Sequence, residues 1–169
     1  DLHAARLEGL FVPGIVMGHE FAGEVLALGP DVSGWRPGER VTINPNGDVC
    51  GACRECRSGR TNLCRARKTG SVGVKRDGGM APYVSVSVVV LHRLPDGVSA
   101  RQGAWVEPLA VALRVVRVAE FRVGGSAVVL GAGSIGLLTL QVLRRAGAGY
   151  IAVVEPSSLR RETATRLGA

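Results

Sequence analysis

The sequence has few aromatic residues, few lysines and no long apolar run. Aromatic side chains make up 4% of its 169 residues, and none lies between Trp35 and Tyr83. Proteins that bind nucleic acid commonly stack bases on aromatic side chains or present a recognition helix, so the formal net charge of +7 does not indicate a nucleic-acid partner. No apolar run approaches the roughly 20 residues that span a bilayer. We therefore expect neither a nucleic-acid partner nor a membrane partner.

Cysteine is also scarce, and its four copies lie in one short segment. Cys50, Cys53, Cys56 and Cys64 form a C-x2-C-x2-C-x7-C pattern. Two disulfides are the alternative, but cysteines separated by two residues would close strained small rings. Four thiolates hold zinc in closed structural sites, so the spacing predicts a structural zinc that takes no part in chemistry. Reduced cysteines and the lack of a secretory h-region predict a cytoplasmic protein.

Basic residues crowd this cysteine segment, and Glu55 is the only acid among them. Four thiolates around Zn²⁺ carry a net charge of about −2, which nearby basic side chains would offset. The basic residues of the segment are Arg54, Arg57, Arg60, Arg65, Arg67 and Lys68.

Residues 20–94 have the pattern of short strands separated by turn residues. We expect strands at 20–28, 40–43 and 80–91, the last carrying an alternation of valine and serine. Strands of this length and spacing are typical of a compact β-barrel or sandwich.

The pattern changes at Ser99, which has capping-box spacing to Gln102. A helix is expected at 106–119, with Pro108 in its first turn. After two glycines, the sequence predicts a strand, a helix, a strand and a helix, which is the start of a parallel, doubly wound sheet. The predicted fold class is therefore mixed α/β. The four predicted elements are 127–130, 135–145, 150–154 and 157–167.

The first of those strands runs into Gly131-Ala-Gly133-Ser134-Ile135-Gly136, a G-x-G-x-x-G sequence that opens a helix. In this context the motif predicts a dinucleotide site. Gly131 allows the sharp turn, Gly133 lets the pyrophosphate approach, and Gly136 lets the helix pack on the strand. A tight turn without a ligand is the alternative.

Glu155 ends the next strand, where an acid in such folds accepts hydrogen bonds from the adenosine ribose. A carboxylate there would repel a 2′-phosphate, which favours NAD over NADP. Arg160 and Arg161 favour the opposite choice, because one of them could bind that phosphate. Glu155 could also serve, alone or in addition, as an acid that stabilises a helix N-terminus.

Three further residues, His19, Glu20 and Glu107, are each explained by packing or capping when taken singly. The order of all the motifs is distinctive, and it resembles the zinc-dependent medium-chain alcohol dehydrogenases, most of all their polyol, sorbitol, threonine and 2,3-butanediol branch. The motifs in order are Asp1-Leu-His3, Gly18-His19-Glu20-Phe-Ala-Gly23, the cysteine segment, Gly78-Gly79-Met-Ala-Pro-Tyr83-Val, Glu107-Pro108-Leu-Ala-Val and the glycine turn.

The resemblance implies roles for five residues. His19 would be a ligand of a catalytic zinc, Glu20 and Glu107 would coordinate it directly or through water, and the zinc would keep one position open. Asp1 would orient His19, and His3 would relay the released proton to solvent. The zinc would acidify the hydroxyl of a small alcohol or polyol, and the nicotinamide would take its hydride.

The resemblance also implies a GroES-like, zinc-binding catalytic domain over 1–120 and the start of an NAD(P)-binding Rossmann domain over 121–169. In the family, the first ligand of the catalytic zinc is a cysteine that would sit three positions before Asp1. We therefore expect a chain truncated at both ends, which keeps its structural zinc and lacks turnover. The full-length enzyme is expected to be a homo-oligomer.

Two other interpretations stay open. The chain could derive from a related zinc-free reductase, although His19, Glu20 and Glu107 would then have no metal to bind. It could also be a small zinc-binding interaction module, which would need neither the glycine turn nor the acid that follows it.

Overall fold

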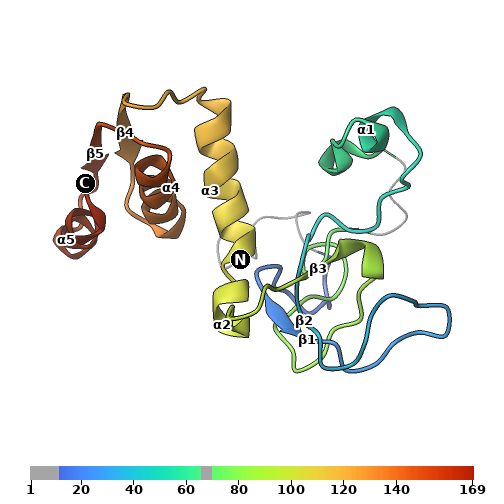
Figure 1. The fold of residues 1–169 in the computed structure, drawn as a ribbon. Helices are drawn as coiled ribbons and strands as arrows, with labels where there is room; N and C mark the ends of the chain where they lie inside the picture. Colours follow the sequence, from blue (N-terminus) through green and yellow to red (C-terminus); the bar gives the residue numbers. More distant parts are fainter. Residues whose placement is uncertain (1–11, 66–69) are drawn as a thin grey trace. The chain divides into compact units, whose positions relative to one another are not determined.

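The structure, a computed structural model, describes residues 12–65 and 70–169. Contacts divide the chain into two units, Asp1–Glu107 and Pro108–Ala169 (Figure 1). The division falls within helix α3 (Val106–Val118), which contributes Val116 to the core of the second unit. The domain boundary predicted between residues 120 and 121 stays a prediction.

The first unit contains a three-stranded antiparallel sheet in the order β1, β2, β3. The strands are β1 (Ala22–Glu24), β2 (Arg40–Ile43) and β3 (Leu91–Arg93). The central strand β2 is the most buried, and the hydroxyl of its Thr42 donates to the Phe21 carbonyl at 3.1 Å. That bond ties the chain just before β1 to the middle of the sheet.

Two of the expected strands differ from the structure. β1 covers only the middle of the predicted strand at 20–28. Residues 80–87, all within the described part of the chain, form no strand, although β3 begins at Leu91. Tyr83, Val84 and Val86 instead line a cavity of about 650 Å³ together with residues of β1 and β2. Ser85 lines the same cavity, so the alternation in the sequence marks neither one face of this segment nor a ladder of backbone hydrogen bonds.

The other elements of the first unit are short. The cysteine segment holds α1 (Arg54–Arg57) and η2 (Thr61–Leu63), and η3 (Val88–Val90) precedes β3. Ser99 is the N-cap of helix α2 (Ala100–Gly103), and both hydrogen bonds of the predicted capping box to Gln102 are present.

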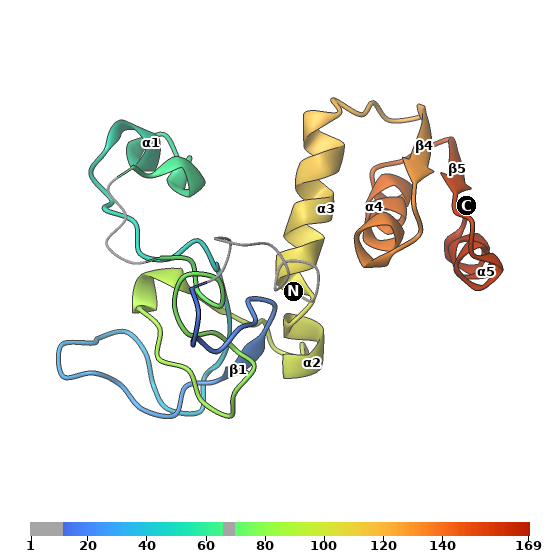
Figure 2. The ribbon, with the colours of Figure 1, turned by 180° about the vertical axis from the view of Figure 1, so that it is seen from behind.

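The second unit confirms the predicted alternation of strands and helices (Figures 1 and 2). After α3 come β4 (Ser126–Leu130), α4 (Ser134–Arg145), β5 (Tyr150–Val154) and α5 (Ser158–Leu167). β4 and β5 are parallel neighbours, as expected for a doubly wound sheet.

The core of the second unit lies between the two strands and their helices. Val129 of β4 and Ile151 of β5 pack with Leu140 and Leu143 of α4 and Ala164 of α5. Leu140 is fully buried. The longest described helix, α3, has 13 residues, and none of the helices in the described part of the chain is long and apolar enough to cross a membrane.

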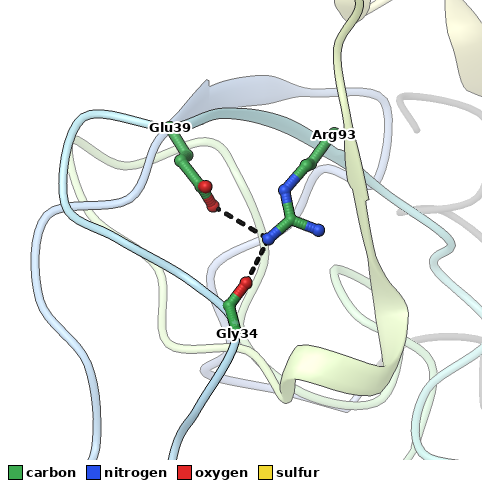
Figure 3. A network of polar contacts seen from close by, with 3 residues as sticks. All are labelled: Gly34, Glu39 and Arg93. Atoms are coloured by element: carbon green, nitrogen blue, oxygen red, sulfur yellow. Dashed lines mark hydrogen bonds and ion pairs between the residues drawn. The ribbon is translucent and has the colours of Figure 1, made fainter.

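Arg93 ties β3 to the loop that precedes β2 (Figure 3). Its guanidinium lies 4.0 Å from the centroid of the Trp35 ring. It also donates to the Gly34 carbonyl, and to a Glu39 carboxylate oxygen at 3.3 Å. The Arg93 side chain is 53% exposed, so water screens its ion pair with Glu39. Its stacking on the Trp35 ring should therefore contribute more to stability than the ion pair does.

Replacing Arg93 with Ala should lower the free energy of unfolding by about 1 kcal/mol, since it removes a cation–π contact worth about 0.5–1 kcal/mol and a surface ion pair. Arg93→Lys should recover only part of this loss, because an ammonium group cannot reproduce the planar stacking. Urea denaturation followed by tryptophan fluorescence measures the effect. Glu39→Gln removes the ion pair alone, and a loss as large as that of Arg93→Ala would contradict the dominant role of the ring.

Candidate metal centres and nucleotide-binding turn

The four cysteine thiols converge on one point. Neighbouring Sγ atoms are 3.4 Å apart for Cys53 and Cys56, 3.7 Å for Cys50 and Cys64, 3.9 Å for Cys50 and Cys56, and 4.0 Å for Cys53 and Cys64. A tetrahedron with metal–sulfur bonds of about 2.3 Å has edges of about 3.8 Å. All four cysteines are free thiols in the structure, so the arrangement fits a metal ion and not a pair of disulfides.

Local turns of the backbone hold the thiols in place. Gly51 and Gly59 take the left-handed conformation, with φ of +68° and +75°. The Cys53 N–H donates to the Cys50 sulfur at 3.3 Å, and the Cys50 N–H donates to the Cys64 sulfur at 3.5 Å. The bond to the Cys50 sulfur favours its thiolate, which is the form that binds metal.

Two of the thiols have shifted pKa values. The N–H groups of Ala52 and Cys53 lower the pKa of Cys50 to about 6. Burial and the hydrogen bond with Cys53 raise the pKa of Cys56 to about 12. The segment therefore offers one thiolate readily, and an ion that binds there must displace the proton from Cys56.

Two basic side chains form hydrogen bonds within the cysteine segment. Arg57 donates to the Ala52 carbonyl at 2.9 Å, and Arg60 donates to the Ser58 hydroxyl at 3.1 Å. Their predicted role in offsetting the charge of the metal centre stays a prediction, and Arg67 and Lys68 lie outside the described residues.

A second cluster forms in the same unit from residues far apart in the sequence. His19, Glu20 and Glu107 each offer a ligand atom, and these atoms lie within 4.8 Å of one another. His19 and Glu20 precede β1, whereas Glu107 lies in the first turn of α3. One imidazole and two carboxylates are a suitable ligand set for a divalent ion such as zinc.

The electrostatics of this cluster also favour a cation. Burial raises the pKa of Glu107, His19 opposes the shift, and the neighbouring Glu20 adds to it. Two carboxylates this close repel each other, and a shared ion would remove the repulsion. Asp1 and His3, the other two residues expected at this site, lie outside the described residues.

The glycine turn has the geometry expected of a phosphate-binding loop. Gly131 has a φ of +96°, and Gly133 is the N-cap of α4. A Cβ on Gly136 would overlap the Gly131 carbonyl, so only glycine lets the helix lie this close to the strand. A Cβ on Gly133 would meet no atom within 4 Å, which leaves that side of the turn, beside Ser134 and Ile135, open to a ligand.

Glu155 is buried at the end of β5, and both its carboxylate oxygens accept backbone hydrogen bonds. One accepts from the Ala132 N–H of the glycine turn at 2.8 Å, and the other from the Ser157 N–H at 3.0 Å. The N–H groups of Ser157 and Ala132 lower the pKa of Glu155 and keep it ionised. Since Ser157 is the N-cap of α5, the structure shows the helix-terminus role that the sequence left open.

The two arginines that follow Glu155 have different surroundings. The Arg161 guanidinium donates to the carbonyls of Glu155 and Pro156, at 2.7 and 2.6 Å. Arg160 is exposed and near enough to Glu155 to lower its pKa. Of the two, Arg160 is therefore the one whose guanidinium is not committed to these carbonyls.

Sequence reasoning missed the contacts that hold the chain next to His19, although Gly18 and Gly78 each stood in a motif. Asp77 accepts a hydrogen bond from the Val16 N–H at 2.9 Å, and Gly73 and Gly78 pack against the backbone of Gly18. The signals in the sequence were the glycine content of residues 70–79 and the motif that begins at Gly78, and neither indicates the contact with Gly18.

Comparison with known proteins gives the following matches. The profile of the alcohol dehydrogenase GroES-like domain matches residues 1–96. The chain is 41% identical to 2-dehydro-3-deoxy-L-galactonate 5-dehydrogenase of Pseudoalteromonas atlantica, over 90% of this chain and 43% of that enzyme. It is also 41% identical to sorbitol dehydrogenase of Halalkalibacterium halodurans, over 89% of this chain and 43% of that enzyme.

Solved structures agree with this result. A protein of Sinorhizobium meliloti 1021, crystallised with NADP, has a TM-score of 0.84 and 39% identity, covering 94% of this chain and 46% of that one. The chain spans about half the length of the curated relatives it matches. The matches confirm the predicted fold class, a GroES-like β domain followed by the start of a Rossmann domain. The chain belongs to the zinc-dependent medium-chain alcohol dehydrogenase family.

Proposed function

We propose that the protein is a zinc-dependent oxidoreductase that transfers a hydride from a secondary alcohol or polyol to NAD(P). The observation that supports this most is the convergence of His19, Glu20 and Glu107, whose ligand atoms lie within 4.8 Å of one another in a chain of this family. Dehydrogenases of sorbitol and of a sugar acid are among its relatives, which supports a hydroxylated small molecule as the substrate.

In this proposal His19, Glu20 and Glu107 hold the catalytic zinc, which when bound lowers the pKa of the substrate hydroxyl. His19 binds through a neutral ring nitrogen, and the two carboxylates balance the charge of the ion. Asp1 orients His19, and His3 carries the released proton to solvent, a task suited to a group with a pKa near neutrality.

The second unit holds the nucleotide in this proposal. The pyrophosphate lies against Gly133 and the N-terminus of α4, where free N–H groups face it. Each carboxylate oxygen of Glu155 has a further lone pair, so it can accept hydrogen bonds from the adenosine ribose while it binds the backbone. A carboxylate at this point disfavours a 2′-phosphate, and NAD is the preferred cofactor.

The four-cysteine site holds a structural zinc in this proposal. Its ligands come from one segment, Cys50 to Cys64, and the thiols surround the centre on all sides, so no position is left for a substrate. The ion fixes the shape of a segment whose helices are only three and four residues long.

Changing His19 to Ala in the complete gene product should lower kcat/KM for alcohol oxidation by about a thousandfold, since the ion that stabilises the transition state is lost. Reduction of the nicotinamide with a panel of secondary alcohols and polyols provides the assay. His92→Ala changes an exposed histidine of β3 and serves as the control. Wild-type protein that oxidises none of these substrates would refute the proposal.

Changing Cys64 to Ser should remove one zinc ion per chain. It should also lower the free energy of unfolding by about 4 kcal/mol at free zinc a thousandfold above its Kd. Metal analysis and thermal unfolding measure the two effects. Ser58→Ala alters a hydroxyl of the same segment that is not a ligand, and it should retain the ion. Full zinc content in Cys64→Ser would show that the four thiols do not act together.

Changing Glu155 to Ala should shift the ratio of kcat/KM values for NAD and NADP towards NADP, because the charge that repels the 2′-phosphate is gone. Arg160→Ala should shift the ratio towards NAD, since it removes the available guanidinium. Initial rates with both cofactors measure the ratio. If the wild-type enzyme already prefers NADP, Arg160 outweighs Glu155 and the assignment of NAD is wrong.

A further inference from the structure

Two segments of the first unit pair through their backbones beside His19. The N–H groups of Gly78, Gly79 and Met80 donate to the carbonyls of residues 16, 18 and 17, at 2.8, 2.8 and 2.9 Å. The Asp77 carboxylate closes the pairing by accepting from the Val16 N–H at 2.9 Å. We call this pairing of residues 16–18 with residues 77–80 the glycine junction.

Close packing in the glycine junction excludes side chains. A Cβ on Gly78 would overlap the Gly18 carbonyl and the Gly73 Cα, and a Cβ on Gly73 would overlap the same carbonyl. Gly18, Gly73 and Gly78 are all buried. Because the neighbouring atoms belong to the backbone, they cannot move aside as a flexible side chain would.

The glycine junction fixes the chain on one side of the metal cluster, and the sheet fixes it on the other. Gly18, with φ of +100°, leads directly into His19 and Glu20. Phe21 follows, and its carbonyl accepts the hydrogen bond from Thr42 of β2. Two residues held between two anchored neighbours have little freedom to change the direction of their Cα–Cβ bonds.

We propose that Asp77, Gly73 and Gly78 are positioning residues for the metal site, because they fix the backbone that carries His19. This inference rests on the proposed function, since it assumes that His19, Glu20 and Glu107 bind a divalent ion. Groups that orient a metal ligand typically contribute about 10- to 100-fold to metal affinity. The glycine junction acts on the backbone of the ligand and not on its ring.

The test measures the affinity of the second site for Co²⁺ in the protein whose cysteine site is already loaded with zinc. Visible absorption of Co²⁺ bound by nitrogen and oxygen ligands reports the site without any need for turnover. Gly78→Ala should weaken binding by at least about tenfold. Gly23→Ala is its matched control, because neither glycine has a positive φ and a Cβ on Gly23 meets no atom within 4 Å.

Gly73→Ala has a matched control as well. Gly73 and Gly97 both have a positive φ, +73° and +84°, so alanine strains the backbone at either position. Only at Gly73 would the new methyl group overlap the Gly18 carbonyl. Gly73→Ala should therefore weaken Co²⁺ binding, whereas Gly97→Ala should bind Co²⁺ as the wild type does.

Asp77 tests the proposal without any overpacking. Asp77→Ala removes the acceptor for the Val16 N–H and should weaken Co²⁺ binding by about tenfold. Asp77→Asn keeps an oxygen acceptor and should restore wild-type affinity, which separates the hydrogen bond from the charge. Circular dichroism and the zinc content of the cysteine site check that each variant is folded. If the glycine variants do not fold, this pair decides the question.

Equal Co²⁺ affinity in wild type and Asp77→Ala would overturn the inference. His19→Ala distinguishes that failure from failure of the proposed function. If His19→Ala loses Co²⁺ while Asp77→Ala binds it normally, the metal site stands and only the positioning role is wrong. If His19→Ala binds Co²⁺ as tightly as wild type, the metal site itself is wrong, and the positioning role with it.

Discussion

Backbone packed directly against backbone is the constraint on which the His19 cluster depends. The Gly18 carbonyl accepts a hydrogen bond from Gly79 and lies against Gly73 and Gly78, where no Cβ would fit. Residues 61 positions apart in the sequence, Val16 and Asp77, are joined by a hydrogen bond at the same place. The direction in which His19 leaves this junction is therefore set by a part of the chain that contributes no ligand. Such packing tolerates very little change, because interiors are filled to near-crystalline density.

The two candidate metal centres of the first unit differ in how they are assembled. The four thiols come from one segment, and its turns are stabilised by hydrogen bonds within that segment. The His19 cluster instead joins the chain before β1 to the first turn of α3. A local centre of four thiolates gains its shape from the ion, since metal binding and folding are coupled there. A centre built from distant elements gains its shape from the tertiary fold, and the centre is lost when that fold unfolds in part.

This difference explains how much could be predicted from the sequence. Cys50, Cys53, Cys56 and Cys64 were predicted as one site because their spacing alone brings them together. The elements of the second unit were predicted because apolar residues recur with helical or strand periods and glycines separate them. His19, Glu20 and Glu107 were grouped only through the resemblance to a family, since no local pattern relates a residue before β1 to one in α3.

Two features could not be predicted, and both depend on partners distant in the sequence. Residues 80–87 alternate like a strand, yet they form none, and residues 81–86 line a cavity beside β1 and β2. Alternation records which side chains are apolar, whereas a strand also requires a neighbour that offers backbone hydrogen bonds. The bond from Asp77 to Val16 was equally hidden, because an aspartate before two glycines indicates only a turn.

Under the proposed function, Glu155 links cofactor choice to cofactor anchoring in the second unit. Its carboxylate binds the Ala132 N–H of the glycine turn and the Ser157 N–H at the start of α5. The residue proposed to select the ribose therefore also fixes the turn proposed to receive the pyrophosphate. A change at Glu155 must disturb the shared turn for NAD and NADP alike, so neither affinity alone reports on selection. Only the ratio of the kcat/KM values for NAD and NADP isolates the effect of the Glu155 charge on the 2′ position.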